Sequence, residues 1–319
     1  MTVQLSVLDP VPLSCGQSPR DALRAAIQLA QTAERSGYRR VWYAEHHLPR
    51  AAVCPAPAVL VAAVAAATER IRVGSGGVVL RHHAPWHVAE TFSTLAALHP
   101  GRIDLGVAGG TGADEQTTRR LGGDGTPYPD RLAALDEALR DLNADVHGWV
   151  LGASARSAEL AATLGWHYGS GNVTGDPGDV QAYREQHTAR RHAGPTVALA
   201  VAVVCADTTE AALHLARSHR AYFSAQGTAP GGQPVPPPAG LPVTPGPLAL
   251  YPRLVVGDPV TVRSALNALA RRYGADELAL LTITHDPQAR RHSYALIAEA
   301  FAQAAPPPIH LPHQPGGYL

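Results

Sequence analysis

The segment YAEHHLP, residues 43–49, places one carboxylate beside two imidazoles directly after an apolar run. These residue types fit a metal site, an acid/base site or simply a polar strand end. A second imidazole pair, His82 and His83, follows the next apolar run. Adjacent side chains on an extended backbone point to opposite sides, so each pair supplies at most one ligand to a shared metal, which needs three or four. The pattern therefore favours acid/base chemistry or substrate contact, and we expect no bound metal.

A third polar segment, LGASARSAELAATLG at residues 151–165, follows an apolar strand and opens a helix. Ser154 and Ser157 lie in the first turn of that helix. Backbone N–H groups at a helix N-terminus, joined by two hydroxyls, form an anion site that suits a phosphate. Simple N-capping by serine is the alternative interpretation.

Glycines gather in GSGGVVL, residues 74–80, and in VAGGTGADE, residues 107–115. Their spacing matches neither a GxGxxG fingerprint nor a phosphate-binding P-loop. Glycine inside a strand usually marks a bulge or the close approach of a ligand. A ligand that covers both glycine segments and has a phosphate at the next helix is large, planar and phosphorylated, a description that flavin mononucleotide (FMN) fits.

The elements that position these residues alternate between short apolar strands and helices. Such repeated βα units predict a parallel sheet covered by helices. Eight strands in this order, with no break in composition, favour the α/β class and a single (β/α)8 TIM barrel, in which the loops after the strands build the active site. The strands are predicted at 3–9, 39–45, 70–80, 102–108, 148–152, 166–171, 196–206 and 276–284. The helices are predicted at 20–37, 56–69, 86–98, 129–142, 156–164, 178–191, 208–223, 259–273 and 288–303.

We expect one barrel domain over residues 1–304 and an irregular Pro-rich tail over 305–319. Residues 226–250 carry Pro and Gly at a density that forbids regular structure, so they form a long insertion between late barrel units. An active-site lid over the barrel mouth and a plain disordered insertion both remain open.

Composition excludes several classes of protein. Lys+Arg and Asp+Glu balance at 26 each, so a nucleic-acid partner is not expected. The N-terminus has no signal-peptide pattern and the longest apolar run stops after about a dozen residues, so we expect a cytoplasmic protein with no membrane partner. Cys15, Cys54 and Cys205 lie far apart without a CxxC motif, which predicts buried thiols.

Several segments together resemble the bacterial luciferase-like, flavin-dependent monooxygenases, especially the branch that acts in bacterial natural-product and antibiotic biosynthesis. The resemblance covers most of residues 3–302 and includes GYRRVWYAEHH, AAATERIRVGSGGVVL, LAALHPGRIDLGV and LGASARSAELAATLG. It implies a TIM barrel that binds reduced FMN (FMNH2) supplied by a separate flavin reductase. Such an enzyme uses O2, through a C4a-peroxyflavin, to oxygenate a bulky organic, polyketide-like small molecule. We expect a homodimer, with a heterodimer as the alternative.

The resemblance also assigns roles to individual residues. His46 is the catalytic residue beside the flavin, where an imidazole with a pKa near neutrality suits proton handling. Glu45 and His47 orient it or contact substrate, and Gly76–Gly77 matches a non-proline cis peptide of many relatives. The residues expected to hold the cofactor are Ser75, Gly76, Gly77, Gly109, Gly110, Arg131, Gly152, Ser154, Ala155, Arg156 and Ser157.

One departure from the family pattern opens two further hypotheses. Gly109 stands where relatives carry an arginine directed at the FMN phosphate. Loss of a hydrogen bond to a charged group costs about 1.5–3 kcal/mol, which weakens flavin binding. The same loss fits an F420-dependent hydride-transfer enzyme of this fold, or a luciferase-like non-catalytic subunit or flavin-binding protein.

Overall fold

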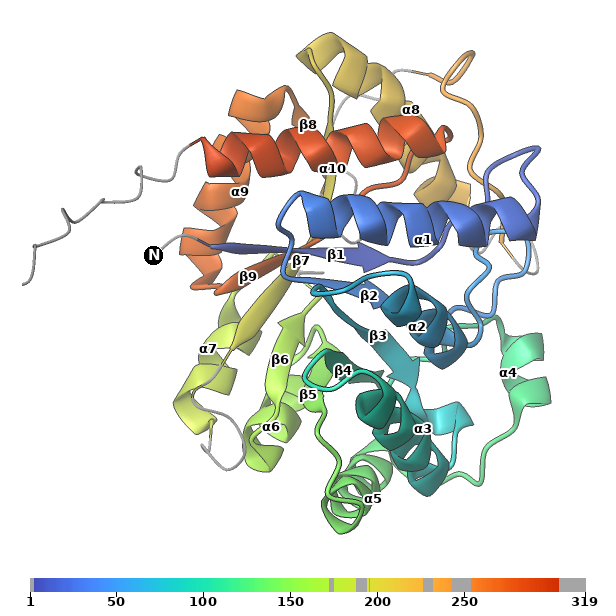
Figure 1. Cartoon of the computed structure of the whole chain (residues 1–319), viewed down its shortest axis with the longest axis vertical. Helices are drawn as coiled ribbons and strands as arrows, with labels where there is room; N and C mark the ends of the chain where they lie inside the picture. Colours follow the sequence, from blue (N-terminus) through green and yellow to red (C-terminus); the bar gives the residue numbers. More distant parts are fainter. Residues whose placement is uncertain are drawn as a thin grey trace, which may run out of the picture.

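The protein is a closed parallel barrel surrounded by helices (Figure 1). The computed structural model describes residues 3–171, 175–187, 194, 196–225, 232–242 and 254–303. Around the barrel the strands follow the order β1-β2-β3-β4-β5-β6-β7-β9, and β9 pairs with β1 to close it. Their bounds are β1 Gln4–Asp9, β2 Arg40–Tyr43, β3 Arg72–Val79, β4 Ile103–Ala108, β5 His147–Gly152, β6 His167–Ser170, β7 Val197–Cys205 and β9 Glu277–Leu281.

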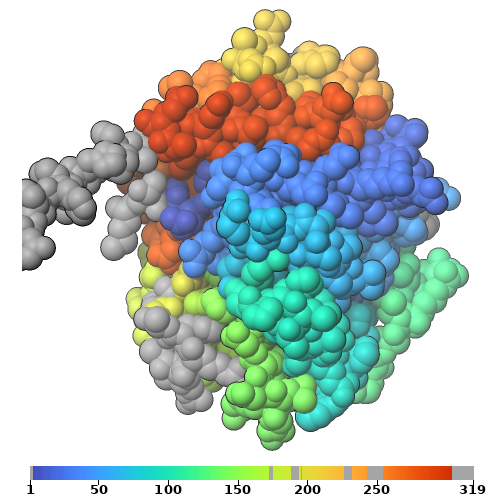
Figure 2. Space-filling model, in the orientation of Figure 1, coloured from blue at the N-terminus to red at the C-terminus, as the bar shows by residue number. Residues whose placement is uncertain are grey.

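Helices cover the barrel in chain order, so α10, α1, α2 and α3 form neighbouring rows on one face (Figure 2). Proline begins or enters the first turn of α1, α2, α3, α5, α9 and α10, where its missing N–H costs nothing. None of the described helices is both long and apolar enough to span a bilayer. The helices are α1 Pro19–Arg35, α2 Pro57–Ala66, α3 Pro85–Leu98, α4 Glu115–Leu121, α5 Tyr128–Asp141, α6 Ala155–Leu164, α7 Gly178–Gln186, α8 Thr209–Ala225, α9 Pro259–Tyr273 and α10 Pro287–Ala302, with a short 3-10 turn η1 Leu80–His82.

Strand β7 shows how the barrel interior is filled. All nine of its residues are buried. Alternate residues of this strand, from Val197 to Cys205, pack outward in the main hydrophobic core, while Ala198 faces inward with Trp42 and Trp149. Those two indoles meet edge to face at 4.8 Å. Small residues on one wall thus leave room for large aromatic side chains from the opposite wall, as barrel interiors require.

A buried ion cluster closes the N-terminal end of the barrel. Arg40 Nη1 lies 2.6 Å from Asp104 Oδ2, and Arg40 Nε lies 2.7 Å from Glu277 Oε1. Burial opposes ionisation of Asp104, but the guanidinium groups of Arg40 and Arg72 outweigh it and lower the pKa of that carboxyl. The cluster lies opposite the barrel mouth, at the end where polar residues serve stability.

The eight predicted strands are the eight strands of the barrel, so the TIM-barrel prediction is confirmed. Besides the 3-10 turn η1, two elements were not predicted: α4, which has no buried residue, and β8 (Leu254–Gly257), which pairs only with β7 outside the barrel circuit. Neither carries the apolar period of a core element. Cys15 is exposed, so the prediction of a buried thiol is wrong there, whereas Cys54 and Cys205 are buried.

The Pro-rich insertion is described only over residues 232–242. Val235 is fully buried and bonds through its backbone to Leu13 and Cys15, near the start of the chain. This short piece is therefore fixed against the loop that follows β1. Three parts of the predictions lie outside the described residues: 226–231 and 243–250 of the insertion, 188–191 of the helix predicted at 178–191, and the tail 305–319.

Candidate active site

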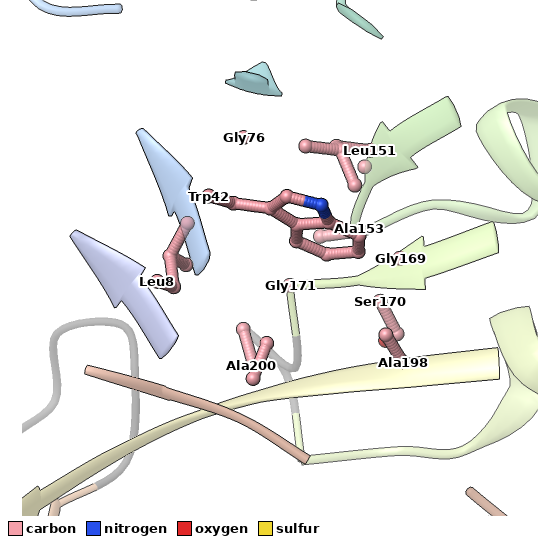
Figure 3. A pocket seen from close by; sticks show the side chains of 12 residues that line it. Leu8, Trp42, Gly76, Leu151, Ala153, Gly169, Ser170, Gly171, Ala198 and Ala200 are labelled. Atoms are coloured by element: carbon pink, nitrogen blue, oxygen red, sulfur yellow. The ribbon is translucent and has the colours of Figure 1, made fainter. Parts of the chain in front are cut away.

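Two adjoining cavities lie where the strands end at the barrel mouth. The smaller has a volume of about 230 Å³ and is enclosed by the barrel strands, with the Trp42 indole reaching from β2 toward Leu151 of β5 (Figure 3). The larger has a volume of about 340 Å³ and lies over the ends of β2, β3 and β4. Leu8 and Gly76 line both cavities. Together they form one recess, in the size range of about 300–1,000 Å³ that is usual for small-molecule sites.

His46 lines the larger cavity directly after β2. Its backbone N–H donates to the Cys54 carbonyl at 3.1 Å, which fixes the direction of the side chain. Burial lowers the pKa of its imidazole, and the neighbouring Ala44 carbonyl and Glu45 carboxylate offset this only in part. Its Nδ1 atom is buried and has no hydrogen-bond partner within the described chain. A neutral imidazole with an unused nitrogen can accept or donate one proton at the cavity wall.

Glu45 makes its hydrogen bonds to two histidines other than His46. His47 and His83 each place Nε2 at 2.8 Å from Glu45 Oε1, and Val79 N–H donates to Oε2 at 2.9 Å. The Glu45 side chain is fully buried, whereas that of His83 is 33% exposed. Glu45 therefore joins the end of β2 to the end of β3. The sequence predicted a role for Glu45 and His47 beside His46, but it did not predict His83 as the second partner.

Replacing Glu45 is expected to change how stability depends on pH. Burial raises the pKa of Glu45, but hydrogen bonds from His83 and His47 outweigh it, so the pKa lies below its ordinary value of 4.5. Such a depressed pKa contributes stability that is present above pH 4.5 and is lost as the pH falls through the folded-state pKa. In urea unfolding from pH 3 to 7, Glu45→Gln should lower the free energy of unfolding by about 1.5–3 kcal/mol at neutral pH. The decrease of stability with falling pH should also be smaller in this variant. Glu69→Gln, at a side chain that is 85% exposed, is the control; equal pH slopes in the wild type and Glu45→Gln would contradict the assignment.

The glycines of β3 let other groups approach its backbone closely. A Cβ on Gly76 would lie 2.7 Å from Trp42 Cβ and 2.8 Å from Leu8 Cδ1, and one on Gly77 would lie 2.8 Å from the Gly106 carbonyl. The Gly76–Gly77 peptide bond is cis, as predicted. Gly76, Gly77 and Gly110 all line the larger cavity, so three of the predicted cofactor residues meet His46 there.

Gly76→Ala should therefore disturb the recess itself. The new methyl group overlaps Trp42 and Leu8, which both line the smaller cavity. Overpacking of this kind costs about 1–3 kcal/mol, and we expect FMNH2 affinity to fall by roughly tenfold or more. Thermal unfolding and anaerobic FMNH2 titration measure the two effects. Gly178→Ala is the matched control, since a Cβ there meets Asp176 only at an ordinary contact distance of 3.6 Å. Identical behaviour of the two variants would refute the role of Gly76 in shaping the recess.

The predicted phosphate turn begins α6, next to the smaller cavity. Ser154 and Ser157 form a reciprocal capping box, so each hydroxyl already serves the other residue's amide. The capping leaves the amides of Ala155 and Arg156 at the helix N-terminus for an anion. Gly152 lines the smaller cavity, and a Cβ on it would lie 2.2 Å from Ser157 Oγ.

Three predicted cofactor residues have other contacts. Ser75 is fully buried, and its hydroxyl bonds to the Gly106 backbone of β4. Arg131 donates to the His83 carbonyl at 2.8 Å and pairs with Asp124. Gly109 packs against Tyr128, whose ring would lie 3.1 Å from a Cβ there. None of the three is among the residues that line the two cavities.

The structure also adds lining residues that the sequence did not mark. Leu8, Trp42, Tyr222 and Phe223 line the recess, the last two from the C-terminal end of α8. In the sequence they have the spacing of ordinary core positions. Only the barrel geometry, which gathers the ends of distant elements at one mouth, separates them from the rest of the core.

Comparison with known proteins places this site in a family. The profile of luciferase-like monooxygenases matches residues 3–144. Protein YwcH of Bacillus subtilis (strain 168) is 35% identical, with 94% of this chain and 99% of that protein covered. A luciferase-like monooxygenase of Escherichia coli (strain K12) is 33% identical, with 92% and 96% covered. The crystal structure of apo-MsnO8 is 36% identical, with a TM-score of 0.85 and 94% and 98% covered.

More distant structures share the fold alone. They include the oxygenating constituent of 3,6-diketocamphane monooxygenase from Pseudomonas putida in complex with FMN, at 19% identity and a TM-score of 0.69. They also include an F420-dependent secondary alcohol dehydrogenase, at 17% identity and a TM-score of 0.65. The long matches at 33–36% identity are the ones that decide the assignment: this chain belongs to the luciferase-like monooxygenase family of oxidoreductases.

Proposed function

We propose that this protein is a two-component monooxygenase that takes FMNH2 from a separate flavin reductase and uses O2 to oxygenate a bulky organic, polyketide-like molecule. The observation that supports this most strongly is the wall of the larger cavity. It holds His46, with an unused buried nitrogen, next to the glycine pair Gly76–Gly77. A group that can handle a proton and a glycine pair without side chains thus line the same cavity.

The residues present fit a flavin. Gly76, Gly77 and Gly110 present backbone without side chains in the lining of the larger cavity, and a Cβ added at Gly110 would meet no atom within 4 Å. The amides of Ala155 and Arg156 at the α6 N-terminus suit a phosphate, and Gly152 and Ala153, which precede this turn, line the smaller cavity. Bound reduced flavin supplies the electrons that activate O2.

The chain's own contribution is to exclude water and to handle a proton. The lining of the recess is mostly apolar, which shields the reacting groups from solvent. The lowered pKa of His46 keeps its imidazole neutral at pH 7, so it can take up a proton from a group at the cavity wall and return it. Glu45 acts as a positioning residue for His47 and His83, because both imidazoles are hydrogen-bonded to its carboxylate.

An F420-dependent hydride-transfer enzyme is the second candidate. It is favoured by Gly109, which has no side chain to meet a phosphate and instead contacts Tyr128. The F420-dependent secondary alcohol dehydrogenase, which has the same fold, supports this second candidate.

An anaerobic titration separates these functions. Protein at fixed concentration is mixed with FMNH2, oxidised FMN or F420H2, and binding is followed by fluorescence and by equilibrium dialysis. The proposal predicts saturable FMNH2 binding that is at least about tenfold tighter than F420H2 binding. Tight F420H2 binding without FMNH2 binding would favour hydride transfer, and binding of neither would favour a non-catalytic subunit.

We also propose a homodimer formed through α2 and α3, which lie side by side on one face (Figure 2). Helix α2 contains no charged residue and leaves Val59 72% exposed, and α3 leaves Leu98 66% exposed. A helix that is apolar all round is normally covered. Light scattering should show a dimer that Val59→Arg converts to monomer, whereas Val260→Arg on α9 leaves it intact. A wild-type monomer would refute this proposal.

A further inference from the structure

The larger cavity has two unlike walls. One is made by Gly76, Gly77 and Gly110 together with His46, where the proposed flavin ring lies. The other consists of aliphatic and aromatic side chains that the proposed flavin contacts do not involve. This apolar wall consists of Pro10, Leu48, Tyr222, Phe223 and Leu281.

Two residues of the apolar wall, Tyr222 and Leu281, are fixed by contacts with the surrounding protein. Tyr222 is buried and donates its hydroxyl to the Ala51 carbonyl at 3.2 Å. Tyr222 and Leu281 belong to a small hydrophobic cluster that also contains Val235 of the Pro-rich insertion. A ligand that enters the cavity therefore meets a preformed surface, which lowers the entropy cost of binding.

Phe223 differs from its neighbours because it is only partly buried. Its ring lies 5.3 Å from Tyr222, nearly perpendicular to it, and 4.7 Å from His219. It packs against the second hydrophobic cluster without belonging to its buried members. Phe223 is thus an aromatic side chain at the edge of the cavity, placed to contact a ligand.

The charge around the cavity restricts what can bind. Although the chain has 26 basic residues, no arginine of the described part of the chain is among the residues that line this cavity. Its lining carboxylate, Glu45, already accepts bonds from His47 and His83. A charged group that entered would lose its hydration without meeting a free counter-charge, which is costly.

We infer that the apolar wall is the substrate subsite, that it takes an uncharged and predominantly apolar ring system, and that Phe223 determines specificity. This inference rests on the proposed function, because it assumes that the flavin lies against the glycine wall and leaves the apolar wall to the substrate. Aromatic faces bind aromatic or conjugated rings through offset or edge contacts. The same subsite rejects anionic relatives of its ligand.

The test uses two matched probes on the full chain. Prodan is an uncharged dimethylaminonaphthalene ketone whose fluorescence shifts in an apolar site, and the corresponding dimethylaminonaphthalene sulfonate is its anionic counterpart. We expect prodan to bind wild-type protein at least ~10-fold more tightly than the sulfonate. Phe223→Asp should weaken prodan binding by ~10-fold or more, whereas Phe223→Leu should weaken prodan binding by about threefold or less.

Leu213→Asp, at a position on α8 that is 48% exposed, controls for an added charge on the helix. Circular dichroism checks folding, and Phe223→Asn replaces Phe223→Asp if the latter unfolds. Equal binding of the two probes to the wild type, or equal effects at Phe223 and Leu213, would overturn the inference. FMNH2 affinity is measured in parallel and should change by less than about twofold in each variant. Loss of FMNH2 binding in the wild type would refute the proposed function alone, while normal FMNH2 binding with an unaltered prodan response would refute the subsite alone.

Discussion

His46→Ala should lower the rate at which the FMNH2-loaded protein reacts with O2 by about 10²–10⁴-fold, the usual contribution of a positioned acid or base. FMNH2 affinity should change little, because Gly76, Gly77 and Gly110 and the capped N-terminus of α6 stay in place. The physical reason for this expectation is that His46 lines the larger cavity and that burial lowers the pKa of its imidazole. Stopped-flow absorbance after mixing with oxygenated buffer measures the rate.

The pH profile gives the same prediction a second readout. Burial holds the pKa of His46 below its ordinary value of 6.5, so the reactive neutral form predominates above that pH. The wild-type rate should be flat from pH 6.5 to 8 and should fall as the pH drops through the lowered pKa. His46→Ala should be slow and flat throughout. His87→Ala, at a side chain that is 77% exposed on α3, is the control and should behave as wild type. If the pH profile of His46→Ala matched that of His87→Ala, the proposed role of His46 would be contradicted.

Asp104→Ala should be the most destabilising single substitution that we propose, at about 3–5 kcal/mol. Asp104 accepts bonds from Arg40, Arg72 and the Trp42 indole, at 2.6, 2.8 and 3.0 Å. Its side chain is fully buried and that of Arg40 is 1% exposed. Removal of the carboxylate leaves a buried guanidinium with only Glu277 as counter-charge. Urea unfolding followed by circular dichroism measures the loss.

The control for Asp104 is an exposed ion pair of the same kind. Glu69→Ala removes a partner of Arg70 at side chains that are 85% and 75% exposed, and should cost less than about 1 kcal/mol. Because Trp42 reaches from this cluster to the smaller cavity, Asp104→Ala should also weaken FMNH2 binding. A loss of stability no larger than that of Glu69→Ala would show that the cluster does not hold the barrel together.

The sequence predicted the barrel because its evidence is periodic: apolar strands and amphipathic helices alternate at intervals that only repeated βα units explain. The position of His46 followed from the same pattern, since residues that end a strand gather at the mouth. The glycines near 76 and 110 were informative because a side chain there would collide or would fill the recess.

Other parts of the site could not be predicted, because they depend on contacts between distant residues. His83 lies 38 residues from Glu45, and no local sequence pattern predicts the hydrogen bond between them. Phe223 and Tyr222 fit an ordinary amphipathic helix, and only the closure of the barrel turns the end of that helix toward His46. Arg131 matched a phosphate-contacting position of the family, yet it bonds to the His83 carbonyl and to Asp124.

One measurement tests the central claim most directly: the reoxidation of FMNH2 by O2 with increasing concentrations of protein. The account predicts a protein-dependent phase whose amplitude follows the fraction of FMNH2 bound and whose rate constant falls in His46→Ala. A time course identical to that of free FMNH2 at every protein concentration would contradict it.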